Sequence, residues 1–436
     1  MSNRGQNLSP SSKTAFMSTM SPTELSVPFF GIQCNWDEVL KRNKGKVWAS
    51  VRRQGESVSS HATLISGDSE NSINNVSSTE SFLVPKVSNS RHITLQDPMS
   101  HYECSFIAPV AVYDSIHKKS VISLDVTEGG LGVSVCGSNQ LKVWETDTGT
   151  VRRTLEGHVA DIYTCRFFPS GVVILSAGAD LCIKIWSAEN GQNPVTLKGH
   201  RGPILDTCVV DRGRNILSVS KDGTARLWDC GMSTTLATLA ECNSAINSCC
   251  LIAPSSVDLG LHSTPMSDRE IGTSGKLLLL AREDGKVQGV GLGSRESIFL
   301  APVPSPANSI ISTGANSFAV GCQGGQIATF DLRKIVPPKH INSVTPTPIL
   351  SLMSHPRSPA SKPSSDESER FFWAAKSDGS VVLVNPSGNA RKIVQLTGSD
   401  HDPIYSVKHD GTYVFTACRD GCIRKYAINH VTQLCS

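Results

Sequence analysis

The sequence predicts an all-β protein in which a seven-bladed β-propeller follows a small N-terminal domain. Two observations carry this prediction. Trp144, Trp186 and Trp228 are spaced by 42 residues, and His158 and His200 repeat the same interval, each directly after a glycine. A period of about 40–45 residues that opens on Gly-His and closes on Trp is typical of four-stranded propeller blades.

The unit that ends at Trp186 shows how one blade is built. The apolar run DIYTCRFF precedes the turn PSG, VVILSAG follows it, and CIKIW comes after a second turn at Asp180. Alternating apolar residues between Pro and Gly punctuation predict short antiparallel strands.

Weaker copies bring the count to seven. The first has His117, Ser134 and Trp144, with Ser138 at the turn. The later copies place other residues at the turn and at the closing position: Asp284 and Val290, Gly324 and Phe330, Asp378 and Val384, and Asp420 and Tyr426.

Chain length agrees with seven blades. Residues 105–431 have room for seven repeats once insertions near 253–274 and 355–370 are set aside. The last repeat ends after its third strand, and a closed ring must cover its edges. We therefore expect residues 105–113 to supply the closing strand.

Residues 31–104 contain no repeat and are predicted to form the N-terminal domain. The stretch NWDEVLKRNKGKVWASV indicates a short amphipathic helix followed by a strand, and HITL indicates another strand, whereas 55–90 is polar and Ser-rich. Trp36 and Trp48 favour a packed domain over a free chain. The composition of residues 1–30 predicts a disordered Ser/Thr-rich tail, with neither the apolar core of a secretion signal nor the basic residues of an import signal.

Charge and cysteine usage limit the function classes. The net charge of +3 gives no support to nucleic-acid or membrane binding, and no apolar run approaches the length of a membrane span. The 14 cysteines include no C-x-x-C pair. We expect reduced, structural cysteines in a cytoplasmic and nuclear protein, with no metal and no cofactor.

The residue types of a hydrolase triad are present but repeat once per blade. A chain of hydrogen bonds from Trp through Ser and His to Asp would satisfy all four groups, whereas a triad is not duplicated and needs an oxyanion hole; no G-x-S-x-G occurs. The sequence thus predicts no enzyme and a structural network of His158, Ser176, Asp180 and Trp186 in one blade and His200, Ser218, Asp222 and Trp228 in the next.

Longer stretches resemble one family. CNWDEVLKRNKGKVWAS, CRFFPSGVVILSAGAD, KGHRGPILDTCVVDRGRNILSVSKDGTARLWDCG and CRDGCIRKY are similar to the proteasomal ATPase-associated factor family of WD40 proteins, over about residues 31–428. The resemblance implies a non-catalytic chaperone of the proteasome regulatory particle. Such a chaperone binds the C-terminal domain of an ATPase subunit and controls its docking on the core particle. Outside such complexes we expect a monomer.

The resemblance supplies no contact residues, so these are predicted from position. The residue before each turn Asp should point outward, and interfaces favour Arg and aromatic anchors with a charged rim. The candidates are Asp161, Arg201, Lys221, Glu283, Asp402, Tyr405, Arg419 and Asp420, with Arg201, Tyr405 and Arg419 as anchors.

Two other functions of propellers remain open. A substrate receptor of a cullin-type ubiquitin ligase usually carries W-D-x-R at a blade end, but here Trp228 and Asp229 are followed by Cys230 and Gly231. A propeller that binds RNA or chromatin would need a basic face, which the net charge does not support.

Overall fold

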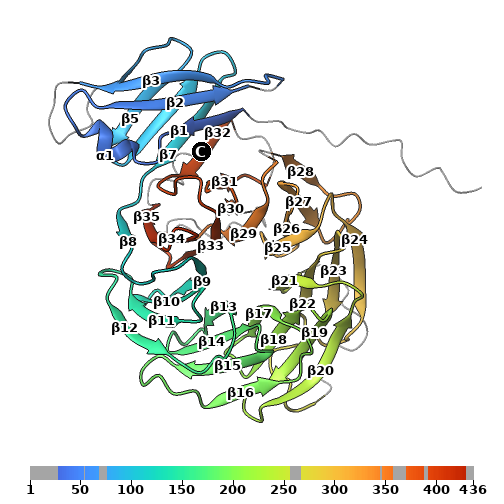
Figure 1. The fold of residues 1–436 in the computed structure, drawn as a ribbon. Helices are drawn as coiled ribbons and strands as arrows, with labels where there is room; N and C mark the ends of the chain where they lie inside the picture. Colours follow the sequence, from blue (N-terminus) through green and yellow to red (C-terminus); the bar gives the residue numbers. More distant parts are fainter. Residues whose placement is uncertain are drawn as a thin grey trace, which may run out of the picture.

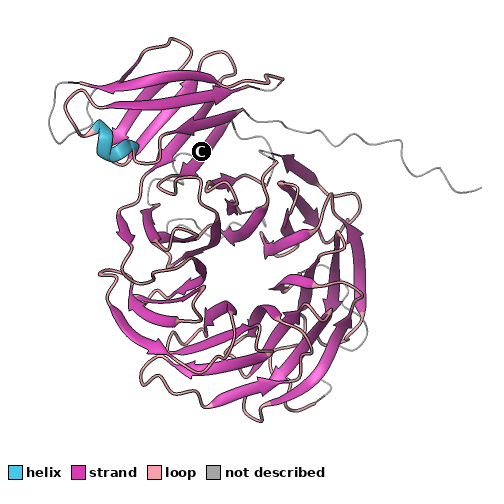
Figure 2. Cartoon of the chain, viewed as in Figure 1, coloured by secondary structure: helices cyan, strands magenta, loops and turns pink. Residues whose placement is uncertain are grey.

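The computed structural model describes residues 28–53, 55–67, 76–255, 267–343, 346–356, 370–386 and 391–428. Figure 1 shows blades arranged around a central axis, with the strands of the N-terminal segment at one side of the ring. Within the described residues the secondary structure is strand apart from one short helix, α1 (Trp36–Leu40) (Figure 2). The predicted fold class, an all-β propeller with a small N-terminal domain, is confirmed.

Two groups of strands precede the ring. The first is a four-stranded antiparallel sheet: β1 (Phe29–Ile32), β2 (Lys46–Arg52), β3 (Ser60–Ser66) and β4 (Val76–Ser78). The second comprises β5 (Val84–Asn89), β6 (His92–Asp97) and β7 (Tyr102–Ile107). One apolar core joins both groups and α1, and Trp36 is fully buried in it. Trp48 is 43 % exposed on β2, so the prediction that both tryptophans are packed away is only half met.

Blades 1–3 are regular four-stranded antiparallel sheets. Blade 1 comprises β9 (Val121–Val126), β10 (Leu131–Cys136), β11 (Leu141–Glu145) and β12 (Val151–Leu155). Blade 2 comprises β13 (Ile162–Phe167), β14 (Val173–Gly178), β15 (Cys182–Ser187) and β16 (Val195–Lys198). Blade 3 comprises β17 (Ile204–Val210), β18 (Asn215–Ser220), β19 (Thr224–Asp229) and β20 (Thr234–Glu241).

Blades 4–7 complete the ring. Blade 4 comprises β21 (Ile246–Ile252), β22 (Leu277–Arg282), β23 (Lys286–Gly291) and β24 (Ser297–Pro302). Blade 5 comprises β25 (Ala307–Ser312), β26 (Ser317–Cys322), β27 (Gln326–Asp331) and β28 (His340–Ser343). Blade 6 comprises β29 (Ile349–Ser354), β30 (Phe372–Lys376), β31 (Val381–Val384) and β32 (Lys392–Leu396). Blade 7 has β33 (Ile404–His409), β34 (Tyr413–Cys418) and β35 (Ile423–Ala427), and its outer strand is β8 (Ala111–Tyr113).

The third-strand tryptophans of blades 1–3 pack against the preceding blade. Trp228 packs with Leu175 and Ile185 of blade 2, and Trp144 packs with Phe415 of blade 7. Gly132 lies opposite Trp144 across the strand pair, where a Cβ would come within 2.4 Å of the indole. Fully burying a large apolar side chain contributes about 1.5–3 kcal/mol, so each of these tryptophans stabilises the contact between its blade and the preceding one.

The segment expected to close the ring, 105–113, forms two strands that join different blades. Residues 105–107 belong to β7, which pairs in parallel with β32, from Lys392 opposite Glu103 to Leu396 opposite Ile107. Only β8 closes the ring, by antiparallel pairing with β35. A single closing strand is wrong because β7 bonds β6 on one side and β32 on the other, so the N-terminal sheet continues into blade 6 as seven strands.

Several expected boundaries differ from the structure or fall outside it. Phe29 and Phe30 begin β1 and do not belong to the tail, whose residues 1–27 are outside the described part of the chain. The insertions near 253–274 and 355–370 are described only at their ends, because residues 256–266 and 357–369 are not described. The Ser-rich stretch 55–90 contains β3, β4 and β5, which the sequence did not predict.

Candidate functional site

The four residues of each predicted network lie together in blades 2 and 3. In blade 2, His158 Nδ1 lies 2.7 Å from Asp180 Oδ2 and His158 Nε2 lies 2.6 Å from Ser176 Oγ. The Trp186 indole N–H donates to the same serine oxygen at 2.8 Å. A neutral histidine protonated at Nδ1 satisfies every group of this chain, because it donates to the carboxylate and accepts from the serine.

Blade 3 repeats the arrangement and adds donors to its aspartate. His200 lies 3.0 Å from Asp222 and 2.7 Å from Ser218, and Trp228 donates to Ser218 at 2.8 Å. Asp222 also accepts the Arg201 backbone N–H at 2.8 Å and the Thr224 hydroxyl at 2.7 Å.

The surroundings lower the pKa values of both network histidines and of Asp222. Burial lowers the pKa of His158 and of His200, against the opposing effect of Asp180 and Asp222, so both imidazoles are neutral near pH 7. Burial would raise the pKa of Asp222, but the hydrogen bonds from Thr224 and the Arg201 amide lower it well below its usual range. The site therefore holds a carboxylate against a neutral histidine.

The serine hydroxyls are not placed to attack a substrate. Ser176 and Ser218 are fully buried, and each oxygen is already bonded to an indole and an imidazole. What the arrangement can do is hold the loop before the first strand against the turn between the second and third strands.

Blade 1 contains an incomplete version of the same chain. His117 Nε2 lies 2.7 Å from Ser134 Oγ, which accepts the Trp144 indole N–H at 3.0 Å. Ser138 stands where blades 2 and 3 have aspartate, and His117 Nδ1 is buried with no hydrogen-bond partner among the described residues. Burial lowers the pKa of His117 to about 4.

The braced loops and turns form one face of the ring, which we call the upper face. The first strand of blade 3 begins at Ile204, opposite the end of the second strand at Ser220. The loop that carries Arg201 and the turn that carries Lys221 therefore lie at the same end of the blade. The Lys221 amide donates to Pro203 O at 2.9 Å, which closes the contact between them.

Six of the eight predicted partner-binding residues are exposed on the upper face, four of them in blades 2–4 and two, Arg419 and Asp420, in blade 7. Asp161, Arg201 and Lys221 lie in the braced loops or turns of blades 2 and 3, and Glu283 lies in the equivalent turn of blade 4. Within the described part of the chain, the guanidinium of Arg201 and the ammonium of Lys221 have neither a hydrogen-bond nor an ion-pair partner. The sequence missed one further feature at the position of Arg201, since Val159, its counterpart in blade 2, is 88 % exposed.

The four candidates of blade 7 are engaged within that blade. Arg419 Nε donates to Asp402 Oδ1 at 2.8 Å, and the Asp420 carboxylate pairs with Arg424 at 2.5 Å. Tyr405 is not on the upper face as expected, because it lies on β33 and lines the central cavity. Of the two anchors predicted in blade 7, Arg419 is thus engaged in an ion pair and Tyr405 lies in the wall of the central cavity.

The central cavity is the feature that sequence reasoning missed. It has a volume of about 1080 Å³ and is lined by the first strands of all seven blades. The third residue of each of these strands is small and polar, and all seven line the cavity: Ser123, Thr164, Asp206, Ser248, Ser309, Ser351 and Ser406. The recurrence of a small polar residue at this position of the repeat was the sequence signal that could have indicated the cavity wall.

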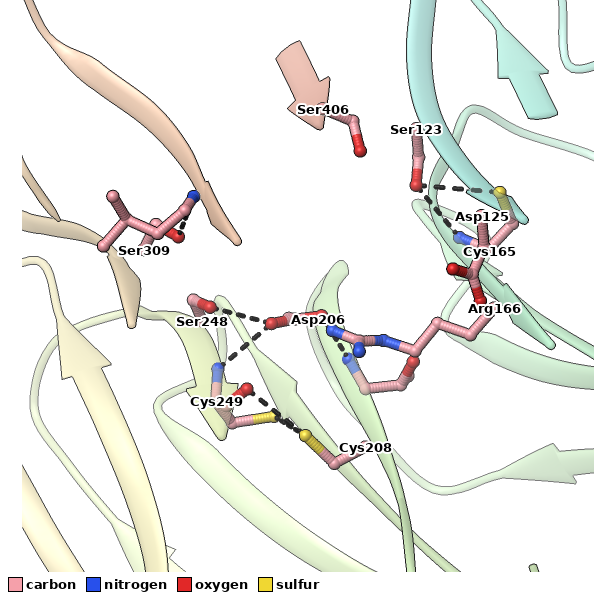
Figure 3. A network of polar contacts seen from close by, with 12 residues as sticks. Ser123, Asp125, Cys165, Arg166, Asp206, Cys208, Ser248, Cys249, Ser309 and Ser406 are labelled. Atoms are coloured by element: carbon pink, nitrogen blue, oxygen red, sulfur yellow. Dashed lines mark hydrogen bonds and ion pairs between the residues drawn. The ribbon is translucent and has the colours of Figure 1, made fainter. Parts of the chain in front are cut away.

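Several of these wall residues connect one blade to the next (Figure 3). Ser123 Oγ accepts the Cys165 amide of the following blade at 3.3 Å, and Ser309 Oγ accepts the Leu352 amide at 3.0 Å. The one carboxylate in the set, Asp206, makes the equivalent bond, since Oδ2 accepts the Cys249 amide at 3.1 Å.

Asp206 also binds the cation of the neighbouring blade. Its Oδ1 accepts a hydrogen bond from Arg166 Nη2 at 2.8 Å (Figure 3). Burial would raise the pKa of Asp206, but the Arg166 guanidinium lowers it, so the pair is ionised at neutral pH. Charged side chains line one arc of the cavity, with Lys408, Asp125 and Arg166 at the same position of blades 7, 1 and 2.

Neither a metal site nor a membrane span emerges from the described ranges. No group of three or more His, Cys, Asp or Glu side chains in them is placed to hold a metal ion. The described helix is too short to span a bilayer.

Comparison with known proteins identifies the repeats and the relatives. The model described as WD domain, G-beta repeat matches residues 149–187, 191–229 and 391–426. The chain is 42 % identical over 399 residues to "Proteasomal ATPase-associated factor 1" of Gallus gallus, covering 91 % of this chain and 98 % of the relative. It is 41 % identical over 400 residues to the protein of that name from Homo sapiens, with the same two coverages. It is 36 % identical over 432 residues to "Probable proteasomal ATPase-associated factor 1" of Dictyostelium discoideum, covering 94 % of this chain and 98 % of the relative.

Proposed function

Because the chain belongs to the proteasomal ATPase-associated factor family, we propose that it is a non-catalytic WD40 scaffold that binds a proteasomal ATPase subunit. The finer proposal is that it binds the C-terminal domain of that subunit and controls docking of the regulatory particle on the core particle. We expect it to act as a monomer outside such complexes, in the cytoplasm and nucleus.

The observation that carries the proposed binding surface is the pair of unpartnered cations on blade 3. Arg201 and Lys221 are exposed, and backbone hydrogen bonds fix both segments, since the Arg201 amide donates to Asp222 Oδ2 at 2.8 Å and the Lys221 amide donates to Pro203 O at 2.9 Å. A preorganised surface binds at a lower entropic cost than a mobile one.

The neighbouring blades extend this surface. Val159 of blade 2 offers an exposed apolar group, and Lys118 and Lys119 of blade 1 are exposed cations without partners among the described residues. An apolar centre beside a charged rim is the usual anatomy of a protein interface. The cations of blades 1 and 3 favour an acidic patch on the ATPase subunit.

The network supports a scaffold over an enzyme. The triad residue types recur in adjacent blades, and in both copies the serine is buried and fully bonded. A structural role accounts for the network in both blades, whereas a catalytic role would account for only one of the two copies.

The test is affinity capture with the tagged full-length chain from cell extract. The wild-type protein should retrieve ATPase subunits of the free regulatory particle, and Arg201→Glu with Lys221→Glu should reduce that recovery by about tenfold, equivalent to about 1.4 kcal/mol. Arg212→Glu is the matched control, because Arg212 is an exposed cation of the same blade in the loop between β17 and β18, at the opposite end.

Two results would count against the proposal. Recovery of cullin adaptors without ATPase subunits would support the ubiquitin-ligase receptor instead. Equal recovery by the double charge reversal and by Arg212→Glu would place the contact away from blade 3.

A further inference from the structure

Two free thiols face each other in the wall of the central cavity. Cys208 lies on β17 of blade 3 and Cys249 lies on β21 of blade 4, and their sulfur atoms are 3.5 Å apart (Figure 3). The Cys249 thiol donates to the Cys208 sulfur, and the Cys208 thiol donates to Cys249 O at 3.2 Å. A disulfide requires a sulfur separation of about 2.05 Å, so a small approach of the two side chains would complete the bond.

Both thiols border the cavity, which gives a small oxidant a route to them. Cys208 and Cys249 are among its lining residues. Cys165 and Cys250 line it too, but their sulfur atoms bond oxygen atoms and contact no other thiol in the described ranges. Cys104, in contrast, is fully buried in the core of the N-terminal domain. The cavity wall therefore contains one pair of adjacent thiols, Cys208 and Cys249, and two thiols that serve as controls, Cys165 and Cys250.

The surroundings make the two thiols unequal. The hydrogen bond from Cys249 lowers the pKa of Cys208, against burial, and the Arg166 guanidinium lowers it further. The same hydrogen bond and burial raise the pKa of Cys249. A thiolate beside a cation is the reactive form of cysteine. Asp206 holds Arg166 in this position, since the two form an ion pair at 2.8 Å.

We propose that Cys208 and Cys249 are an oxidisable pair that peroxide converts to a disulfide between blades 3 and 4. The Cys208 thiolate attacks one oxygen of the peroxide, the O–O bond breaks, and Cys208 becomes a sulfenic acid as hydroxide leaves. The hydroxide takes up the proton that the Cys208 thiol released, which gives the first water. Cys249 then attacks the Cys208 sulfur and forms the S–S bond. The departing hydroxyl takes the Cys249 proton as water, so two thiols are oxidised while one hydrogen peroxide is reduced to two waters.

The experiment uses the full-length protein, reduced, freed of reductant and treated with hydrogen peroxide. After alkylation in denaturant, peptide mass spectrometry should find a cross-link between the peptides that carry Cys208 and Cys249, with a loss of about 2 Da relative to the reduced pair. Dithiothreitol should reverse it. This measurement on the wild-type chain needs no variant to fold.

Variants then assign the two roles. Cys249→Ser should abolish the cross-link and leave Cys208 as a sulfenic acid that dimedone labels, whereas Cys250→Ser should retain the cross-link. Cys165 and Cys104 are the internal references for cavity access and for burial. The proposal is overturned if no cross-link forms, if it survives Cys249→Ser, or if Cys104 is oxidised as fast as Cys208.

Discussion

The incomplete network of blade 1 offers a test of what the recurring aspartate contributes. Blades 2 and 3 place a carboxylate 2.7 Å and 3.0 Å from the histidine Nδ1, whereas His117 Nδ1 of blade 1 is buried without a described partner. We predict that Ser138→Asp completes the chain and stabilises the protein. The turn already has the required shape, because Asn139 has a φ of 59° where Leu181 of blade 2 has 62°.

The size of the effect follows from the bonds gained. The new carboxylate would accept from His117 Nδ1 and from the amide two residues on, as Asp180 accepts from the Cys182 amide at 3.2 Å. A hydrogen bond to a charged group contributes about 1.5–3 kcal/mol, and desolvation of the carboxylate offsets part of it, which leaves about 1–2 kcal/mol. For a chain of this length, that gain is a rise of about 1–2 °C in the unfolding midpoint.

Scanning calorimetry at pH 7 measures the midpoint, and a double-mutant cycle isolates the interaction. Ser138→Asp should raise the midpoint in the wild-type background and have no effect together with His117→Gln. An equal rise in both backgrounds would mean that the carboxylate acts through the turn alone. No rise in either background would refute the view that the aspartate satisfies the histidine.

Three further predictions test the brace and the closure of the ring. Asp222→Ala should cost about 1–3 kcal/mol of stability in calorimetry, because it leaves His200 and the Arg201 amide without their acceptor. His117 alone should lower the free energy of unfolding by about 2 kcal/mol between pH 7 and pH 5. The unfolded chain protonates this histidine below about pH 6.5, whereas the folded protein, in which the pKa of His117 is about 4, does not. In urea titrations, His117→Gln should therefore remove this contribution to the loss of stability in acid. Tyr113→Phe should cost about 1 kcal/mol by removing the hydroxyl bond to Thr146 O at 2.6 Å, seen as a lower midpoint with earlier proteolysis at the closing strand.

The sequence predicted best what repeats within a short span. Trp186 and Trp228, the histidines that precede them and the turn aspartates recur at fixed offsets because each set must satisfy the same buried groups in its own blade. That regularity was sufficient to place Val290, Phe330, Val384 and Tyr426 on the third strands of blades that lack the tryptophan.

Contacts between distant segments were not predictable in the same way. β7 and β32 are nearly 300 residues apart and pair in parallel, and no local pattern of apolar residues distinguishes that partner from another strand. β3 and β5 mix polar and apolar residues within a polar, Ser-rich stretch, so their sequence resembled a loop. Tyr405 was chosen as an anchor because interfaces favour aromatic residues, and residue type alone did not show that it lies on β33 and lines the central cavity.

Comparison of equivalent positions separates the residues that brace the fold from those available for recognition. The residue after the network histidine is Lys118 in blade 1, Val159 in blade 2 and Arg201 in blade 3, and all three are exposed. The histidine beneath each one makes the same bond to serine, at 2.7, 2.6 and 2.7 Å. Since the histidine–serine bond is constant while the presented side chain changes from cation to apolar group to cation, the side chain at this position varies independently of that bond. Binding specificity should therefore follow Val159 and Arg201, and stability should follow the network beneath them.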